Sequence, residues 1–170
     1  MILPLPENFD ANEIFIIFST VITWFLMYVL PRRLSAVTII IIWTFNVFLA
    51  LLADITISIK PYNFYFTIDH YTHELFDVIL HFVTYPTLPY FVVNFYQHKK
   101  SKGLKRLSYI IFWAGVAIAI EWISLKFHVF TYTGWKLYIS FFVYLVVFAA
   151  NIWLSNFIEK KHPYKRTSTK

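Results

Sequence analysis

Five apolar stretches, each long enough to cross a lipid bilayer, constrain the fold of this chain of 170 residues more than any other feature. They cover about residues 14–30, 34–57, 73–95, 107–125 and 135–157. A helix needs about 20 predominantly apolar residues to cross a hydrocarbon core of roughly 30 Å. The sequence therefore predicts an all-α bundle of five transmembrane helices, a multi-pass integral protein of the cell membrane.

The connections between these stretches contain the helix-breaking and polar residues. The motif Pro-Arg-Arg at residues 31–33 ends the first stretch and makes the first connection a tight hairpin. Residues 58–70 contain a proline, an asparagine and several aromatic residues, and we expect an interfacial loop there. We expect a single transmembrane domain over residues 1–158, followed by a basic cytoplasmic tail over residues 159–170.

The lysines and arginines are distributed unequally between the two sides of the predicted bundle. Twelve of the 15 lie in the first connection, in the loop before the fourth stretch and in the tail, whereas Lys60, Lys126 and Lys136 lie on the other side. Because loops rich in Lys and Arg remain in the cytoplasm, we expect the N-terminus outside and the C-terminus inside.

The same charge distribution indicates the partners of the protein. We expect the basic loop and tail to attract anionic lipids of the inner leaflet of the bilayer, which accounts for the formal net charge of +6 without nucleic-acid binding. A membrane-protein partner at this basic face is a further hypothesis.

Three carboxylic acids fall inside the predicted spans. Asp54, Asp77 and Glu121 all lie toward the outer ends of their helices. An ionised carboxylate in hydrocarbon costs a few kcal/mol, so these side chains are expected to face the bundle interior, a wet cavity or a cationic partner. Their similar depth predicts a single cluster.

Helical spacing places other polar residues on the same faces. Residues three or four apart share one face of a helix. The four resulting seams contain Asn46, Ala50 and Asp54; Glu74, Asp77, His81 and Thr84 or Tyr85; Ala114, Ala117, Glu121, Ser124 and His128; and Lys136, Ser140, Tyr144, Asn151 and Ser155. Seams of this kind point toward one another in a bundle, which predicts a polar interior on the outer side.

This interior has two alternative interpretations. In the first it holds the bundle together through hydrogen bonds and charge pairs, such as Lys136 with Glu121 or Asp77. In the second it binds a small ligand or cation, because ionisable groups inside a membrane are candidates for function. The candidate binding residues are Asp54, Asp77, His81, Tyr85, Asn94, Glu121, Trp122, Lys136 and Tyr144.

An enzyme is the alternative class of function. Asp77 and Glu121 would then act as acid and base on a lipid or isoprenoid substrate. Aromatic residues around residues 122–138 favour an aromatic belt at the membrane interface, or else an aromatic wall over Glu121. The sequence predicts no cofactor.

The third stretch contains two further features. His70, His73, Asp77 and His81 have the spacing of helical metal ligands, but they form no recognised zinc signature, and no metal site is predicted. Pro86 and Pro89 are expected to interrupt the helix and release the carbonyls of about Phe82 and Tyr85, to which the hydroxyl of Thr84 or Thr87 would donate.

The region of residues 70–145 resembles a family of small, uncharacterised multi-pass membrane proteins of spore-forming Firmicutes. The matching residues are Asp77, Tyr85 with Pro86, Asn94 to Tyr96, Glu121 with Trp122, and Gly134 to Lys136. The resemblance implies the cytoplasmic membrane of a Gram-positive endospore former and brings no known activity. The histidines at 70, 73, 81 and 128 are outside the family pattern.

Overall fold

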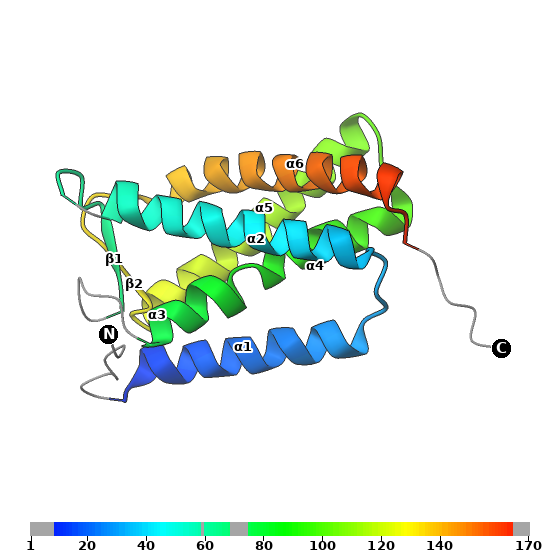
Figure 1. Cartoon of the computed structure of the whole chain (residues 1–170). Helices are drawn as coiled ribbons and strands as arrows, with labels where there is room; N and C mark the ends of the chain where they lie inside the picture. Colours follow the sequence, from blue (N-terminus) through cyan, green and yellow to red (C-terminus); the bar gives the residue numbers. More distant parts are fainter. Residues whose placement is uncertain (1–8, 59, 69–74, 165–170) are drawn as a thin grey trace.

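The computed structural model describes residues 9–58, 60–68 and 75–164. In this part of the chain, five helical segments are long and apolar enough to cross a membrane (Figure 1). The segments are α1 (Ala11–Val29); α2 (Ala36–Ala53) with the π-helical η1 (Asp54–Ser58); α3 (Leu75–Ile79), the π-helical η2 (Leu80–Thr84) and α4 (Thr87–Lys99); α5 (Leu104–Lys126); and α6 (Leu137–Lys161). The predicted all-α architecture of five spans is confirmed.

A small antiparallel sheet closes one end of the bundle (Figure 1). It consists of β1 (Tyr65–Thr67) and β2 (Phe130–Tyr132), with Tyr65 paired directly with Tyr132. Only a loop was expected before α3, so the sequence did not predict this sheet. We call this end of the molecule the sheet end.

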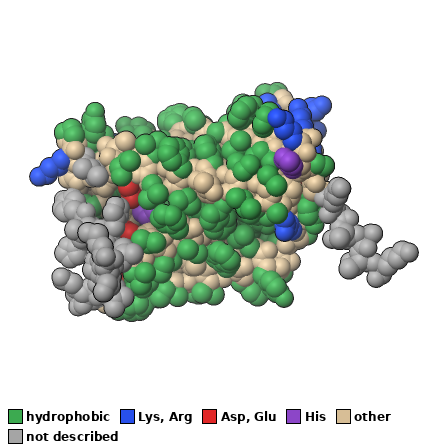
Figure 2. Space-filling view, in the orientation of Figure 1, with side chains coloured by type: hydrophobic (Ala, Val, Ile, Leu, Met, Phe, Trp, Pro, Cys, Tyr) green, Lys and Arg blue, Asp and Glu red, His purple; other side chains and the backbone are tan. Residues whose placement is uncertain are grey.

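The opposite end contains the basic residues, and we call it the basic end. Figure 2 shows a broad hydrophobic surface between the two ends, with most of the visible lysines and arginines gathered at one of them. The residues of the basic end are Arg32, Arg33, Lys99, Lys100, Lys102, Lys105, Arg106, Lys160 and Lys161. A protein that spans a bilayer requires such an apolar band between two polar ends.

The third span, residues 75–99, is the central helix of the bundle. In its most apolar window 67% of the residues are buried, compared with 17–28% in the other four spans. Its Val92 packs with residues of α5 and α6, whereas its Tyr90 and Phe91 pack toward α2. Side chains of this span therefore contact several other helices at once.

The predicted interruption of the third span is present, but its hydrogen bonds differ from those expected. The segment η2 ends at Thr84, and α4 begins at Thr87 after Pro86. The carbonyl of Phe82 accepts a hydrogen bond from the indole of Trp43 at 2.9 Å, and the Thr87 hydroxyl donates to the carbonyl of Thr84 at 2.6 Å. A tryptophan of a neighbouring helix thus satisfies a carbonyl for which a threonine was expected.

Two contacts fix the basic end. The buried carboxylate of Glu159 accepts hydrogen bonds from the backbone N–H of Ser35 at 2.7 Å and from the hydroxyl of Thr38 at 2.6 Å. The side chain of Asn94 accepts from the Arg33 N–H at 2.8 Å and donates to the Pro31 carbonyl at 3.1 Å. The hairpin between α1 and α2 is therefore held by two other spans, and α6 continues to Lys161, into the segment expected to be a tail.

Candidate functional site

The three carboxylic acids of the predicted spans are buried at the sheet end. Only 5% of Asp54, 3% of Asp77 and 8% of Glu121 is exposed. Figure 2 shows acidic side chains, with a histidine between them, at the end of the surface away from the gathered lysines and arginines. The expected polar interior therefore exists.

Asp54 and His81 form the shortest charged contact of this interior. The distance from Asp54 Oδ2 to His81 Nε2 is 2.7 Å, and both side chains are buried. The other ring nitrogen, Nδ1, lies 2.7 Å from the backbone carbonyl of Asp77. The phenol of Tyr65 donates to the second Asp54 oxygen, Oδ1, at 2.8 Å. Every polar side-chain atom of this pair has a partner.

This geometry requires a bound proton. A carbonyl oxygen can only accept, so Nδ1 of His81 must carry a hydrogen. If the ring were otherwise neutral, Nε2 would present a lone pair to Asp54, and an ionised carboxylate has only lone pairs to offer in return. A proton must therefore lie between Nε2 and Oδ2, either on the ring as imidazolium or on Asp54 as the acid.

Local helix geometry brings these two side chains together. Asp54 is the first residue of η1, and His81 lies in η2. A π-helical turn adds a residue to the helical repeat and so redirects the side chains on either side of it, and such turns are frequent at functional sites. Both halves of the pair lie in turns of this kind.

Glu121 forms the second half of the site. Its Oε1 accepts a hydrogen bond from the Ser140 hydroxyl at 2.6 Å and another from the phenol of Tyr132. The indole of Trp135 in turn donates to Ser140 at 2.8 Å. The other oxygen, Oε2, is buried and has no geometrically acceptable hydrogen-bond donor in the part of the chain that the structure describes, although the Tyr144 phenol interacts with the same carboxyl group.

Tyrosines connect the two halves. The phenols of Tyr65 and Tyr85 each interact electrostatically with both Asp54 and Glu121. The Tyr85 hydroxyl is buried and has no hydrogen-bond partner among the described residues. We call the whole set the sheet-end cluster; it consists of Asp54, Tyr65, Asp77, His81, Tyr85, Glu121, Tyr132, Ser140 and Tyr144.

The two tyrosines of the sheet remain hydrogen-bond donors. Burial, followed by the charge of Asp54, raises the pKa of the Tyr65 phenol far above its usual value. Burial, followed by the hydrogen bond to Glu121, raises the pKa of the Tyr132 phenol in the same way. Tyr65 and Tyr132 are directly paired across the sheet. The sheet therefore donates hydrogen bonds to Asp54 of η1 and to Glu121 of α5.

Three predicted site residues lie outside the cluster. Lys136 is exposed and forms no salt bridge with Glu121 or Asp77 in the described structure, so the expected ion pair is replaced by the contact of Asp54 with His81. Trp122 is 53% exposed, with the Lys126 ammonium 5.5 Å from its ring centre. Asn94 lies at the basic end.

The outcome for the other expected seams is mixed. On α5 the seam of Ala114, Ala117, Glu121 and Ser124 is buried as predicted, but His128 lies beyond the helix and is exposed. Among the described residues no group of three His, Asp or Glu side chains is placed to hold a metal ion. His70, His73 and Glu74 lie outside the described residues.

Tyr65 is the cluster residue that the sequence did not predict. It lies in a segment with no helical or alternating pattern, and only the pairing of β1 with β2 places it beside Asp54. In the structure Asp54 and Glu121 are linked by Tyr65 and Tyr85, each of which interacts with both carboxyl groups. Acid–base catalysis by Asp77 and Glu121 stays a prediction.

Comparisons of the chain with models of protein families, with curated proteins and with solved structures found no match. The resemblance to a membrane-protein family of spore-forming Firmicutes therefore stays a prediction.

Proposed function

We propose that this multi-pass membrane protein is a proton-responsive protein of the cell membrane. It binds a proton between Asp54 and His81, and this proton controls the packing of the β1–β2 sheet on the bundle. The observation that carries the proposal is the pair of 2.7 Å contacts to the two nitrogens of His81, which together require one proton more than a neutral ring and an ionised carboxylate hold.

Loss of that proton would have a structural consequence. Two acceptor atoms would face each other inside the protein, and a buried polar group without a partner costs about 1–3 kcal/mol. A neutral ring has one N–H, so His81 would keep its hydrogen bond either to Asp54 or to the Asp77 carbonyl and would lose the other. We expect the contact with Asp54 to be lost, and Tyr65 to follow Asp54 because it donates to the same carboxyl group. Through the direct pairing of Tyr65 with Tyr132, this movement reaches the second strand and Glu121.

The charge distribution supports uptake of the proton from the outer side. The sheet end is opposite the basic end, and the excess of Lys and Arg favours a cytoplasmic position for the basic end. The cluster contains three carboxyl groups and one imidazole, so protons offset its excess of negative charge. Histidine is the residue whose charge changes most readily near physiological pH.

Nuclear magnetic resonance of the histidine ring tests the proposal directly. The full chain, labelled with ¹⁵N-histidine, would be reconstituted in lipid nanodiscs and measured at pH 8, where a free histidine with its ordinary pKa of about 6.5 is mainly neutral. We expect a strongly deshielded proton correlated with Nε2 of His81. The signal should be missing in His81→Gln, which lacks the ring, and also in Asp54→Asn, where Nε2 accepts from the side-chain amide and carries no proton of its own.

The exposed His128 provides the matched control, since His128→Gln removes a ring outside the cluster. This variant should leave the deshielded proton in place. A wild-type spectrum in which Nε2 of His81 neither carries a proton nor accepts a hydrogen bond at pH 8 would contradict the proposal.

A further inference from the structure

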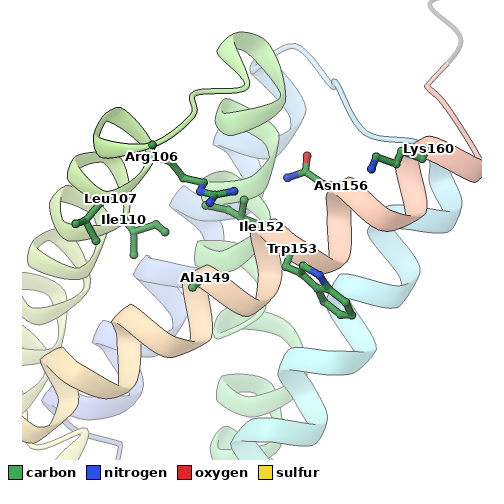
Figure 3. Close-up of a pocket in the computed structure, with 9 residues that line it drawn as sticks. Arg106, Leu107, Ile110, Ala149, Ile152, Trp153, Asn156 and Lys160 are labelled. Carbon is green, nitrogen blue, oxygen red and sulfur yellow. The ribbon is translucent and has the colours of Figure 1, made fainter.

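A pocket of about 530 Å³ opens between α5 and α6 at the basic end, far from the sheet-end cluster. Its volume is within the range of about 300–1,000 Å³ that is usual for small-molecule sites. The lining combines a polar row with an apolar floor, and these two parts differ in what they can bind (Figure 3).

The polar row consists of Arg106, Asn156 and Lys160. Figure 3 shows the amide nitrogen of Asn156 directed toward the Arg106 guanidinium, with the Lys160 ammonium on the other side of Asn156. The amide oxygen of Asn156 already accepts a hydrogen bond from Gln97 at 3.2 Å. The pocket therefore presents hydrogen-bond donors from all three side chains, two of which are positively charged.

The described residues do not neutralise the positive charge of this row. No carboxylate forms a salt bridge with Arg106 or Lys160 in the described ranges. The nearest acid in sequence, Glu159, is engaged with Ser35 and Thr38 on the α2 side. A guanidinium and an ammonium on either side of an amide N–H group match the oxygens of a phosphate group.

The apolar floor is open toward the lipid. Leu107 is 52% exposed and Trp153 is 68% exposed, while Ala149 leaves the space between the two helices free of a large side chain. Large apolar side chains with this exposure, on helices that cross a membrane, contact acyl chains. The floor thus continues the hydrophobic surface of the bundle into the pocket.

We propose that this pocket binds one anionic phospholipid. The phosphate lies along Arg106, Asn156 and Lys160, and an acyl chain passes over Leu107 and Trp153 into the bilayer. Basic pockets between transmembrane helices bind anionic headgroups in this manner. The site is independent of the proton bound at the sheet end.

Native mass spectrometry of the full chain in a neutral detergent measures the affinity for phosphatidylglycerol and, for comparison, phosphatidylcholine. Each cation near a membrane surface contributes about fivefold to the binding of anionic lipid, and two contribute about 30-fold. We expect Arg106→Gln with Lys160→Gln to weaken phosphatidylglycerol binding by about 30-fold. Binding of phosphatidylcholine should be weak and unchanged.

Two further variants distinguish a built site from general attraction. Lys102→Gln with Lys105→Gln removes the same charge outside the pocket and should change the affinity less than about twofold. Ala149→Phe fills the pocket without changing the charge and should weaken binding on the order of tenfold, as when about two methylene groups lose their contact. Unchanged circular dichroism of each variant establishes that it is folded.

Two results would overturn the proposal. One is an equal loss of affinity in the Lys102→Gln/Lys105→Gln variant and in the Arg106→Gln/Lys160→Gln variant, which would mean diffuse attraction to the basic end. The other result combines two observations: glycerol phosphate, which lacks acyl chains, competes as strongly as the lipid does, and Ala149→Phe leaves binding unchanged. Together they would mean that the pocket is only an anion site.

Discussion

The replacement of Asp54 by Asn keeps the hydrogen bonds of the Asp54–His81 pair but removes the titratable proton between the two side chains. Asn and Asp side chains have nearly the same size and shape, so the variant needs no repacking. In Asp54→Asn the amide oxygen still accepts from Tyr65, and the amide nitrogen donates to Nε2 of His81, whose Nδ1 keeps its contact with the carbonyl of Asp77. The variant thus reproduces the protonated pair without holding a titratable proton.

The magnitude of the effect follows from proton linkage. Above the ordinary titration of histidine near pH 6.5, the unfolded chain has a neutral His81 and an ionised Asp54, whereas the folded pair retains one proton. The folded state then binds one proton more than the unfolded state, so stability falls as the pH rises, by about 1.4 kcal/mol per pH unit. For a chain of this length, that corresponds to about 3–6 °C in thermal midpoint per pH unit.

The assay is thermal unfolding in mild detergent from pH 6 to pH 9. We expect the midpoint of the wild type to fall by about 3–6 °C per unit above pH 7 relative to Asp54→Asn, whose own profile reports the remaining titratable groups. The titratable groups that face Asp54 and His81 are Asp77, Tyr65, Tyr85 and, beyond the tyrosines, Glu121. His128→Gln should follow the wild type. Identical pH profiles for the wild type and Asp54→Asn would refute the reasoning.

Two further predictions concern hydrogen bonds. Tyr132→Phe removes a donor to the Glu121 carboxyl group and should lower stability by about 1–3 kcal/mol, measured as the thermal midpoint, whereas Tyr62→Phe, at a residue that is 61% exposed, should have no effect. Asn46 and Asn151 exchange amide hydrogen bonds of 2.7 and 3.1 Å, and a double-mutant cycle with Ala should give a coupling of about 0.5–2 kcal/mol; additive effects would contradict a direct interaction.

Hydrophobic length and helical period account for what the sequence predicted correctly. Span length is set by the thickness of the bilayer, so the five apolar stretches predicted the number of helices and their limits within a few residues. The face of α5 that contains Ala114, Ala117 and Glu121 is buried as expected, because that helix is uninterrupted over those residues. Periodicity is reliable where the helix is regular.

The side chains that contact the buried acids were not predictable, because they depend on irregular helical turns and on a distant strand pairing. A regular α-helical period does not anticipate the π-helical turns at residues 54–58 and 80–84, and these turns hold Asp54 and His81. The cation expected to face the acids was Lys136, but a proton shared with a histidine fulfils that role. The position of Tyr65 depends on the pairing of residues 65–67 with the distant residues 130–132, and local sequence contains no signal for such a contact.

The middle of the bundle separates the two ends. The side-chain amides of Asn46 in α2 and Asn151 in α6 donate hydrogen bonds to each other. Neutral amides do not titrate. Around Val92 and Phe148, the spans α4, α5 and α6 pack as a continuous apolar cluster. A proton taken up at the sheet end therefore favours a local change of structure over transfer across the membrane.

The basic end provides the fixed point for such a change. Glu159 and Asn94, on two different spans, hold the hairpin between α1 and α2 through four hydrogen bonds of 2.6–3.1 Å to its backbone and to Thr38. At the sheet end, by contrast, the contact between Asp54 and His81 depends on one proton. Because the helices are anchored at one end and joined by a titratable contact at the other, release of the proton displaces the helix ends beside the sheet and leaves the phospholipid pocket in place.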